Sequence, residues 1–162
     1  LGPLSNPAGA RRQLMGIFAA DRVEQQARVL AELGTDHAWV VHGSDGLDEL
    51  TTTGESFVAE VKGKDVRTFT VKPEDAGLPR SGFQALVGGT PQQNAAALRA
   101  VLAGEPGAYR DIVLLNAAAA LIVADKASDL KAGVAMAAEA IDSGAASAKL
   151  AALIKATGGS PQ

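Results

Sequence analysis

The amino-terminal third of the chain alternates between strand and helix patterns, and this alternation constrains the fold more than any other feature. Residues 13–18 and residues 38–41 are short apolar runs that predict buried strands. Between them, residues 21–33 repeat apolar side chains at helical spacing, and Asp21 with Glu24 has the spacing of a capping box. Strand, helix and strand in this order are typical of a βαβ unit in an open α/β sheet.

Two β-prone runs follow at residues 56–61 and residues 66–71, and a short turn containing Gly63 joins them. This arrangement predicts a β-hairpin. An antiparallel hairpin together with a parallel βαβ unit makes a mixed sheet. Residues 73–79 contain two prolines and a glycine and predict a loop.

The second half of the chain is rich in alanine and predicts helices that flank this sheet. Thr90 is expected to cap a helix that runs to Gly104. Residues 109–124 are apolar nearly all round and predict a central buried helix. Ser128 is expected to cap a further helix, and residues 149–156 predict the last one. The predicted fold class is therefore α/β, a mixed sheet flanked by helices.

The composition fits one globular domain and argues against several classes of function. The chain has 162 residues, and its net charge of −3 gives no basic signature of a nucleic-acid-binding protein. It has no cysteine, which excludes disulfides and cysteine nucleophiles. His37 and His42 are too few and too close together for a usual histidine zinc site. The longest apolar run, residues 112–124, is shorter than the roughly 20 residues that a membrane helix needs.

Both ends of the chain predict irregular structure. Residues 1–12 are rich in glycine and proline and show no signal-peptide pattern. Because the chain begins without methionine, we expect that Leu1 is not the natural start of the gene product. Residues 158–162 predict a flexible tail.

Two adjacent carboxylates, Asp48 and Glu49, follow the strand predicted at residues 38–41 and are the strongest candidates for chemistry. Ligands of α/β sheets collect beyond the carboxyl ends of strands, and neighbouring glycines permit a close approach to a ligand. Carboxylate oxygens suit Mg²⁺, which often also contacts substrate phosphates. Asp45 is a candidate third ligand, although a role as a turn residue is favoured. The alternatives are a solvated acidic pair without a ligand, or Asp48 as the cap of the next turn.

Other polar residues near this segment have structural interpretations that we favour. His42 could bind a phosphate or act as an acid or base, but a histidine satisfied by a backbone carbonyl is the simpler interpretation. His37 is a weaker candidate of the same kind. Asn6, Arg11 and Arg12 could bind a phosphate or carboxylate from a loop, but paired arginines are more often surface charge.

Three further features are weaker still. Asn116 interrupts an apolar helix, so we expect it to be hydrogen-bonded, more simply across the core than to a ligand. Residues 88–90 could bind an anion at a helix start, but they match neither the P-loop nor the dinucleotide fingerprint. The three threonines at residues 51–53 are interpreted as β-prone sequence.

Several short segments, taken in their order and spacing, form a specific pattern. They are Leu-Gly-Pro-Leu-Ser-Asn-Pro-Ala at residues 1–8, residues 12–16, Val-Val-His-Gly at 40–43, Gly-Leu-Asp-Glu at 46–49, and residues 88–89, 94–95, 113–117 and 141–145. Together they resemble anthranilate phosphoribosyltransferase of tryptophan biosynthesis. The resemblance covers essentially the whole chain.

The resemblance implies transfer of the phosphoribosyl group of phosphoribosyl pyrophosphate to the amine of anthranilate, with Mg²⁺ as cofactor. By motif match it implies that Asp48 and Glu49 bind this metal; it assigns no catalytic or substrate-binding residue to the chain. The implied fold is the nucleoside phosphorylase/phosphoribosyltransferase type, with a small helical domain that forms a homodimer. The implied enzyme is cytoplasmic and binds neither nucleic acid nor membranes.

The family's glycine-rich pyrophosphate loop, its Lys-His-Gly-Asn-Arg segment and its anthranilate-binding arginine all precede the segment that resembles residues 1–8. We therefore expect residues 1–157 to form a partial α/β domain, without the helical domain and the first part of the α/β domain. Such a chain is expected to be inactive alone. Its truncated sheet is expected to favour self-association or pairing with the missing half.

Two relatives of the same architecture remain as alternatives. A pyrimidine nucleoside phosphorylase would use phosphate and a nucleoside, but residues 1–7 and 46–49 favour the transferase. A non-catalytic nucleic-acid-binding relative conflicts with the net charge of −3 and with the retained acidic pair.

Overall fold

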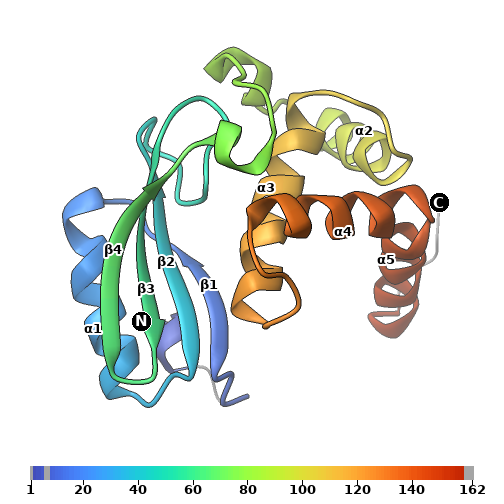
Figure 1. Ribbon diagram of the computed structural model, residues 1–162. Helices are drawn as coiled ribbons and strands as arrows, with labels where there is room; N and C mark the ends of the chain where they lie inside the picture. The colour runs from blue at the N-terminus through green and yellow to red at the C-terminus, as the bar shows by residue number, and fades with distance from the viewer. Residues whose placement is uncertain (1, 6–7, 159–162) are drawn as a thin grey trace.

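The computed structural model describes residues 2–5 and 8–158, which form a mixed sheet with helices on both faces (Figure 1). The elements in chain order are η1 (Gly2–Ser5), β1 (Arg12–Gly16), η2 (Ala20–Arg22), α1 (Val23–Glu32), β2 (His37–Gly43), β3 (Ser56–Lys62), β4 (Asp65–Val71), η3 (Pro73–Ala76), η4 (Phe83–Leu86), α2 (Pro91–Leu102), α3 (Ala108–Val123), α4 (Leu130–Asp142) and α5 (Ala145–Ala156). The predicted α/β class, with a mixed sheet flanked by helices, is confirmed.

The sheet has the strand order β1-β2-β3-β4. β1 and β2 are parallel and connected through α1, which confirms the βαβ unit, and β2, β3 and β4 are antiparallel. The hairpin turn between β3 and β4 consists of Gly63 and Lys64, and Gly63 has a φ of 60°. Glycine adopts this left-handed conformation without a steric penalty, as a two-residue hairpin turn requires.

β2 is the central strand of the core because both of its faces are covered. All seven of its residues are buried. Ala38 and Val40 pack in the cluster beneath α1, whereas Trp39 and Val41 pack in the cluster on the other face, with α3. Figure 1 shows α1 on one side of the sheet and α3 on the other, with α2, α4 and α5 farther from the strands. Alternating side chains thus give two hydrophobic layers.

Two details of the amino-terminal prediction are wrong. The first strand was expected to be buried, but it lies at the edge of the described sheet and only Met15 within it is buried. The helix expected from Asp21 begins with the 3₁₀ turn η2, and α1 starts at Val23 without a side-chain cap. Asp21 and Glu24 therefore do not form a capping box, although helical periodicity is confirmed from Val23 onward.

The carboxyl-terminal helices follow the predictions closely. Thr90 caps α2 in a capping box with Gln93, and α3 is the central helix, as expected. Ser128 does not cap α4, because the side chain of the next residue, Asp129, accepts the hydrogen bond from Ala132 N at 2.9 Å. Residues 73–79 contain the 3₁₀ turn η3 rather than a plain loop. Of the tail predicted at residues 158–162, all but the first residue lie outside the described residues.

Candidate functional site: an acidic loop at the end of β2

The loop of residues 44–55, here called the acidic loop, connects the carboxyl end of β2 to β3 and contains the predicted metal ligands. Asp48 is exposed and Glu49 is half-buried. Neither carboxylate accepts a hydrogen bond or forms a salt bridge with any of the residues that the structure describes. Their oxygens are therefore available to a cation at the place that the sequence predicted.

Electrostatics in the acidic loop favour a bound cation. The pKa of Glu49 is raised above its ordinary value, first by burial and then by the negative charges of Asp48 and Asp45. A positive charge beside Glu49 would reverse this shift, because an opposite charge stabilises the ionised carboxylate. Burial of an ionised carboxylate costs free energy when no opposite charge is near it. A cation bound beside Glu49 would offset this cost.

Asp45 organises the loop from within. Its Oδ2 accepts hydrogen bonds from the Thr51 hydroxyl at 2.6 Å and the Thr53 hydroxyl at 2.7 Å, and its Oδ1 accepts from Leu47 N at 3.2 Å. Burial raises the pKa of Asp45, but these hydrogen bonds outweigh burial and place it below its ordinary value. Asp45 is thus a turn residue, as favoured above. The interpretation of residues 51–53 as β-prone sequence is wrong, since they lie outside the strands and two of their hydroxyls donate to Asp45.

Gly16, the last residue of β1, supports the loop from the neighbouring strand. A Cβ atom added to Gly16 would overlap the backbone carbonyl group of Asp48. Only glycine lets the two backbones approach so closely. This contact places the backbone of Asp48 against the carboxyl end of β1, where α/β sheets bind ligands.

Substitution Gly16→Ala is therefore expected to displace the acidic loop and to lower the free energy of unfolding by about 1–3 kcal/mol. The displacement should appear as faster amide hydrogen exchange in residues 44–55 together with a lower Tm. Gly82→Ala serves as the comparison for stability, because an added Cβ there meets no neighbouring atom and the φ of Gly82 is −77°. Equal exchange of the loop in both variants would show that Gly16 does not support it.

Asn116 connects the loop to α3. Its Oδ1 accepts a hydrogen bond from Leu50 N at 2.9 Å, and its Nδ2 donates to Leu50 O at 2.8 Å and to Ile112 O at 3.0 Å. The expectation of a structural hydrogen bond across the core is confirmed. Leu50 directly follows Glu49, and its side chain is fully buried.

The remaining polar candidates have structural partners. His42 is buried, and its Nδ1 lies 2.8 Å from Ile17 O, which confirms the structural interpretation. Arg11 pairs with Asp36 at 2.6 Å. Arg12 contacts Val123 O and Asp125 at the opposite end of β1 from Gly16, so the arginines do not face the acidic loop. Asn6 lies outside the described residues.

Residues 88–90 offer little to an anion. Gly89 N donates to Asn94 Oδ1 at 2.7 Å, and Thr90 N donates to Gln93 Oε1 at 2.8 Å. Side chains of the same helix thus already satisfy these two N–H groups. Neither of these two N–H groups is therefore free to bind an anion.

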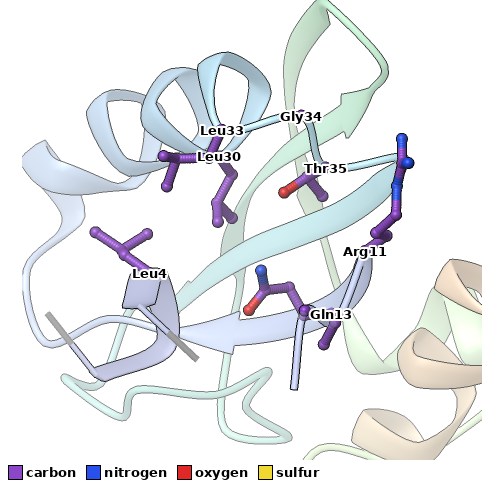
Figure 2. Close-up of a pocket in the computed structure, with 9 residues that line it drawn as sticks. Leu4, Arg11, Gln13, Leu30, Leu33, Gly34 and Thr35 are labelled. Atoms are coloured by element: carbon purple, nitrogen blue, oxygen red, sulfur yellow. The ribbon is translucent and has the colours of Figure 1, made fainter. Parts of the chain in front are cut away.

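The cavity drawn in Figure 2 is separate from the acidic loop. It has a volume of about 200 Å³ and lies between η1, the start of β1 and the end of α1. Arg11 lines the cavity, but its guanidinium group extends away from Leu4 and Leu30 in Figure 2 and pairs with Asp36. The cavity therefore has no converging acid, base or metal ligand among its lining residues.

The acidic pair fits magnesium rather than a metal enclosed by protein. In the part of the chain that the structure describes, no three histidine, cysteine, aspartate or glutamate side chains group into a metal site. Mg²⁺ is commonly bound by one or two carboxylates, several waters and substrate phosphates. Two free carboxylates match that donor set.

No helix among the described residues is long and apolar enough to span a membrane.

Known proteins resemble this chain over nearly its whole length. The anthranilate phosphoribosyltransferase of Parvibaculum lavamentivorans is 65% identical over 159 residues, which are 98% of this chain and 47% of that protein. That of Rhodopseudomonas palustris is 61% identical over 154 residues, 95% of this chain and 46% of that protein. The chain thus spans about half the length of the curated relatives it matches.

Solved structures show the same likeness. The anthranilate phosphoribosyltransferase from Thermus thermophilus has a TM-score of 0.82 and 43% identity, over 91% of this chain and 43% of its own. The enzyme from Saccharomyces cerevisiae, in complex with phosphoribosyl pyrophosphate and Mg, has a TM-score of 0.82 and 26% identity, over 93% of this chain and 44% of its own.

The resemblance to anthranilate phosphoribosyltransferase is therefore confirmed, and with it the fold type. A family model described as "Glycosyl transferase family, a/b domain" matches residues 1–147. That match covers most of the chain, including the sheet, the acidic loop and α3. The chain belongs to the glycosyl transferase family, whose α/β domain these residues match.

Proposed function

We propose that this chain contributes the metal-binding part of an anthranilate phosphoribosyltransferase, in which Asp48 and Glu49 bind Mg²⁺. The observation that carries the proposal is the pair of free carboxylates at the end of β2, in a chain 65% identical to such an enzyme. In this proposal residues 1–157 are a partial α/β domain. The homodimer through the helical domain and the cytoplasmic location belong to the same proposal.

The proposed reaction joins the amine nitrogen of anthranilate to the anomeric carbon of the ribose as the bond from that carbon to pyrophosphate breaks. The nitrogen loses one proton to solvent. Mg²⁺, when bound, supplies positive charge that balances the negative charge of the departing pyrophosphate. Because the amine of anthranilate is uncharged near neutral pH, positioning and electrostatics can provide most of the rate enhancement.

The chain's own residues fix the geometry of the metal ligands. Asp48 and Glu49 present their oxygens beyond the strands, where a substrate phosphate has access. Gly16 and Asn116 hold the backbone on either side of the pair. Asp45 binds Thr51 and Thr53 and therefore does not compete for the metal.

We expect the 162-residue chain alone to show no turnover, because about half of each matched relative has no counterpart in it. Its activity is measured by the loss of anthranilate fluorescence with phosphoribosyl pyrophosphate and Mg²⁺. The comparison is a fusion, here called the joined enzyme, in which the amino-terminal half of the Parvibaculum lavamentivorans relative precedes this chain.

The joined enzyme is expected to consume anthranilate and to be inactive with thymidine and phosphate. Turnover by the chain alone would contradict the predicted inactivity. Phosphorolysis of thymidine in place of anthranilate consumption would contradict the proposed substrate and support the phosphorylase alternative.

A further inference from the structure

We propose that Asn116 is a positioning residue for the metal ligands: from α3 it fixes the backbone beside Glu49 and so sets where the two carboxylates point. This inference rests on the proposed function of Asp48 and Glu49. Asn116 itself contacts no substrate in the proposal. Its three hydrogen bonds lie one residue away from the carboxylate pair.

Asn116 makes three hydrogen bonds that together require one orientation of its amide. Its oxygen faces an N–H donor, Leu50 N, and its nitrogen faces two carbonyl acceptors, Leu50 O and Ile112 O. A flipped amide would place like groups together at all three contacts, so the orientation is determined by the partners. The bond to Ile112 O, one turn earlier in α3, fixes the side chain relative to its own helix.

Leu50 transmits this restraint to the loop. Both of its backbone polar groups bind Asn116, which lies 66 residues further along the chain. Its side chain is fully buried in the same core cluster as Leu115 and Ala119 of α3. Leu50, which directly follows Glu49, is therefore held to α3 both by its backbone and by its side chain.

Two contacts from outside the loop support the backbone on either side of the carboxylate pair. The hydrogen bonds of Asp45 go to Leu47, Thr51 and Thr53, and the side chains of Asp48 and Glu49 have no partner among the described residues. Contact with Gly16 supports the backbone of Asp48 on one side, and Asn116 supports Leu50 on the other. Because the pair lies between these two supports, loss of either allows the carboxylates to move apart.

The test compares Asn116→Ala with Leu121→Ala in the joined enzyme. Leu121 is a partly buried residue of α3 that packs on the core, so its substitution weakens the same helix without a contact to the loop. Two quantities are measured: amide exchange in residues 47–53, and the affinity for Mn²⁺ in the presence of phosphoribosyl pyrophosphate, from water-proton relaxation.

We expect Asn116→Ala to speed exchange of the Leu50 amide and to weaken Mn²⁺ binding by about 10–100-fold, as for other partners that orient metal ligands. Leu121→Ala should change neither quantity. Asn116→Gln keeps both the donor and the acceptor but moves the amide by one methylene group, so its effect should be intermediate, and it carries the test if the alanine variant does not fold.

Two outcomes would overturn the inference in different ways. If Asp48→Ala with Glu49→Ala loses Mn²⁺ but Asn116→Ala binds it as wild type does, Asn116 is not a positioning residue and the metal site stands. If the double acid variant binds Mn²⁺ as wild type does, the proposed metal site itself is wrong.

Discussion

Replacing Asp48 and Glu49 together with alanine is expected to lower the Mg²⁺-dependent turnover of the joined enzyme by at least about 100-fold, because the metal loses its protein ligands. The fold should not weaken. Neither carboxylate has a partner among the described residues, and the double substitution removes a half-buried carboxylate whose pKa is raised by burial and by neighbouring negative charges. The measurement is kcat and KM against Mg²⁺ concentration, with Tm determined on the same samples.

The matched control is Glu105→Ala with Glu139→Ala, which removes two exposed acids that have no salt bridge among the described residues. The control should retain the turnover of the wild type. Unchanged Mg²⁺ dependence in the Asp48 and Glu49 variant would remove these residues from the mechanism. A large fall in its Tm would show instead that the pair is structural.

Replacing Glu60 with alanine is expected to lower the free energy of unfolding by about 3 kcal/mol, because it leaves buried polar groups without a partner. Glu60 is 2% exposed on β3. Its Oε1 accepts a hydrogen bond from Trp39 Nε1 at 3.0 Å and lies 2.9 Å from His37 Nε2, and Arg67 pairs with its other oxygen. Urea unfolding of the chain, followed by Trp39 fluorescence, measures the change.

An exposed ion pair provides the comparison for Glu60. Glu74 accepts a hydrogen bond from Arg80 at 2.6 Å, but both side chains are solvent-exposed. Glu74→Ala is therefore expected to cost no more than about 1 kcal/mol. Equal effects of the two substitutions would show that burial of the Glu60 carboxylate adds nothing to its role.

Glu60 also makes stability depend on pH. Burial raises its pKa, but hydrogen bonds from Trp39, His37 and Arg67 outweigh burial and lower it from 4.5 to about 2. The folded state therefore binds the proton less readily than the unfolded state. The stabilisation is fully present above about pH 4.5 and is lost as pH falls toward 2. Glu60→Gln should show a smaller loss of stability over this range.

The sequence predicted the features that depend on neighbouring residues. Apolar runs and a helical stripe between them indicated the βαβ unit, and Gly63 between two β-prone runs indicated the hairpin. Thr90 was identified as a cap because its partner, Gln93, lies only three residues away. Asp48 and Glu49 stay a prediction: they were chosen as metal ligands because a predicted strand ends shortly before them, and the ends of strands are where α/β sheets bind ligands.

The supports of the acidic loop could not be predicted in the same way, because they join distant parts of the chain. Gly16 at the end of β1 contacts Asp48 in the loop after β2, and the partner of Asn116 lies 66 residues away. The hydroxyls of Thr51 and Thr53 were missed because threonine is also β-prone. The available signal was the spacing of two threonines two residues apart, shortly after the turn residue Asp45. At this spacing both hydroxyls can donate to the same carboxylate.

Local rules failed where two caps compete. Ser128 and Asp129 are both good N-cap residues, and the structure uses Asp129, whose carboxylate accepts a hydrogen bond from Ala132 N.

The burial of Glu60 has no local signal, because its partners come from β2 and β4. A carboxylate in a β-prone run indicates an exposed position unless its cross-strand neighbours are known.

The most direct measurement is the crystal structure of the joined enzyme with Mn²⁺ and phosphoribosyl pyrophosphate, with the metal located by its anomalous scattering. We expect a Mn²⁺ peak within coordination distance of the carboxylates of Asp48 and Glu49, and we expect Asn116 to be hydrogen-bonded to the backbone of Leu50. A Mn²⁺ ion bound elsewhere, with these two carboxylates facing solvent, would contradict the proposed metal site.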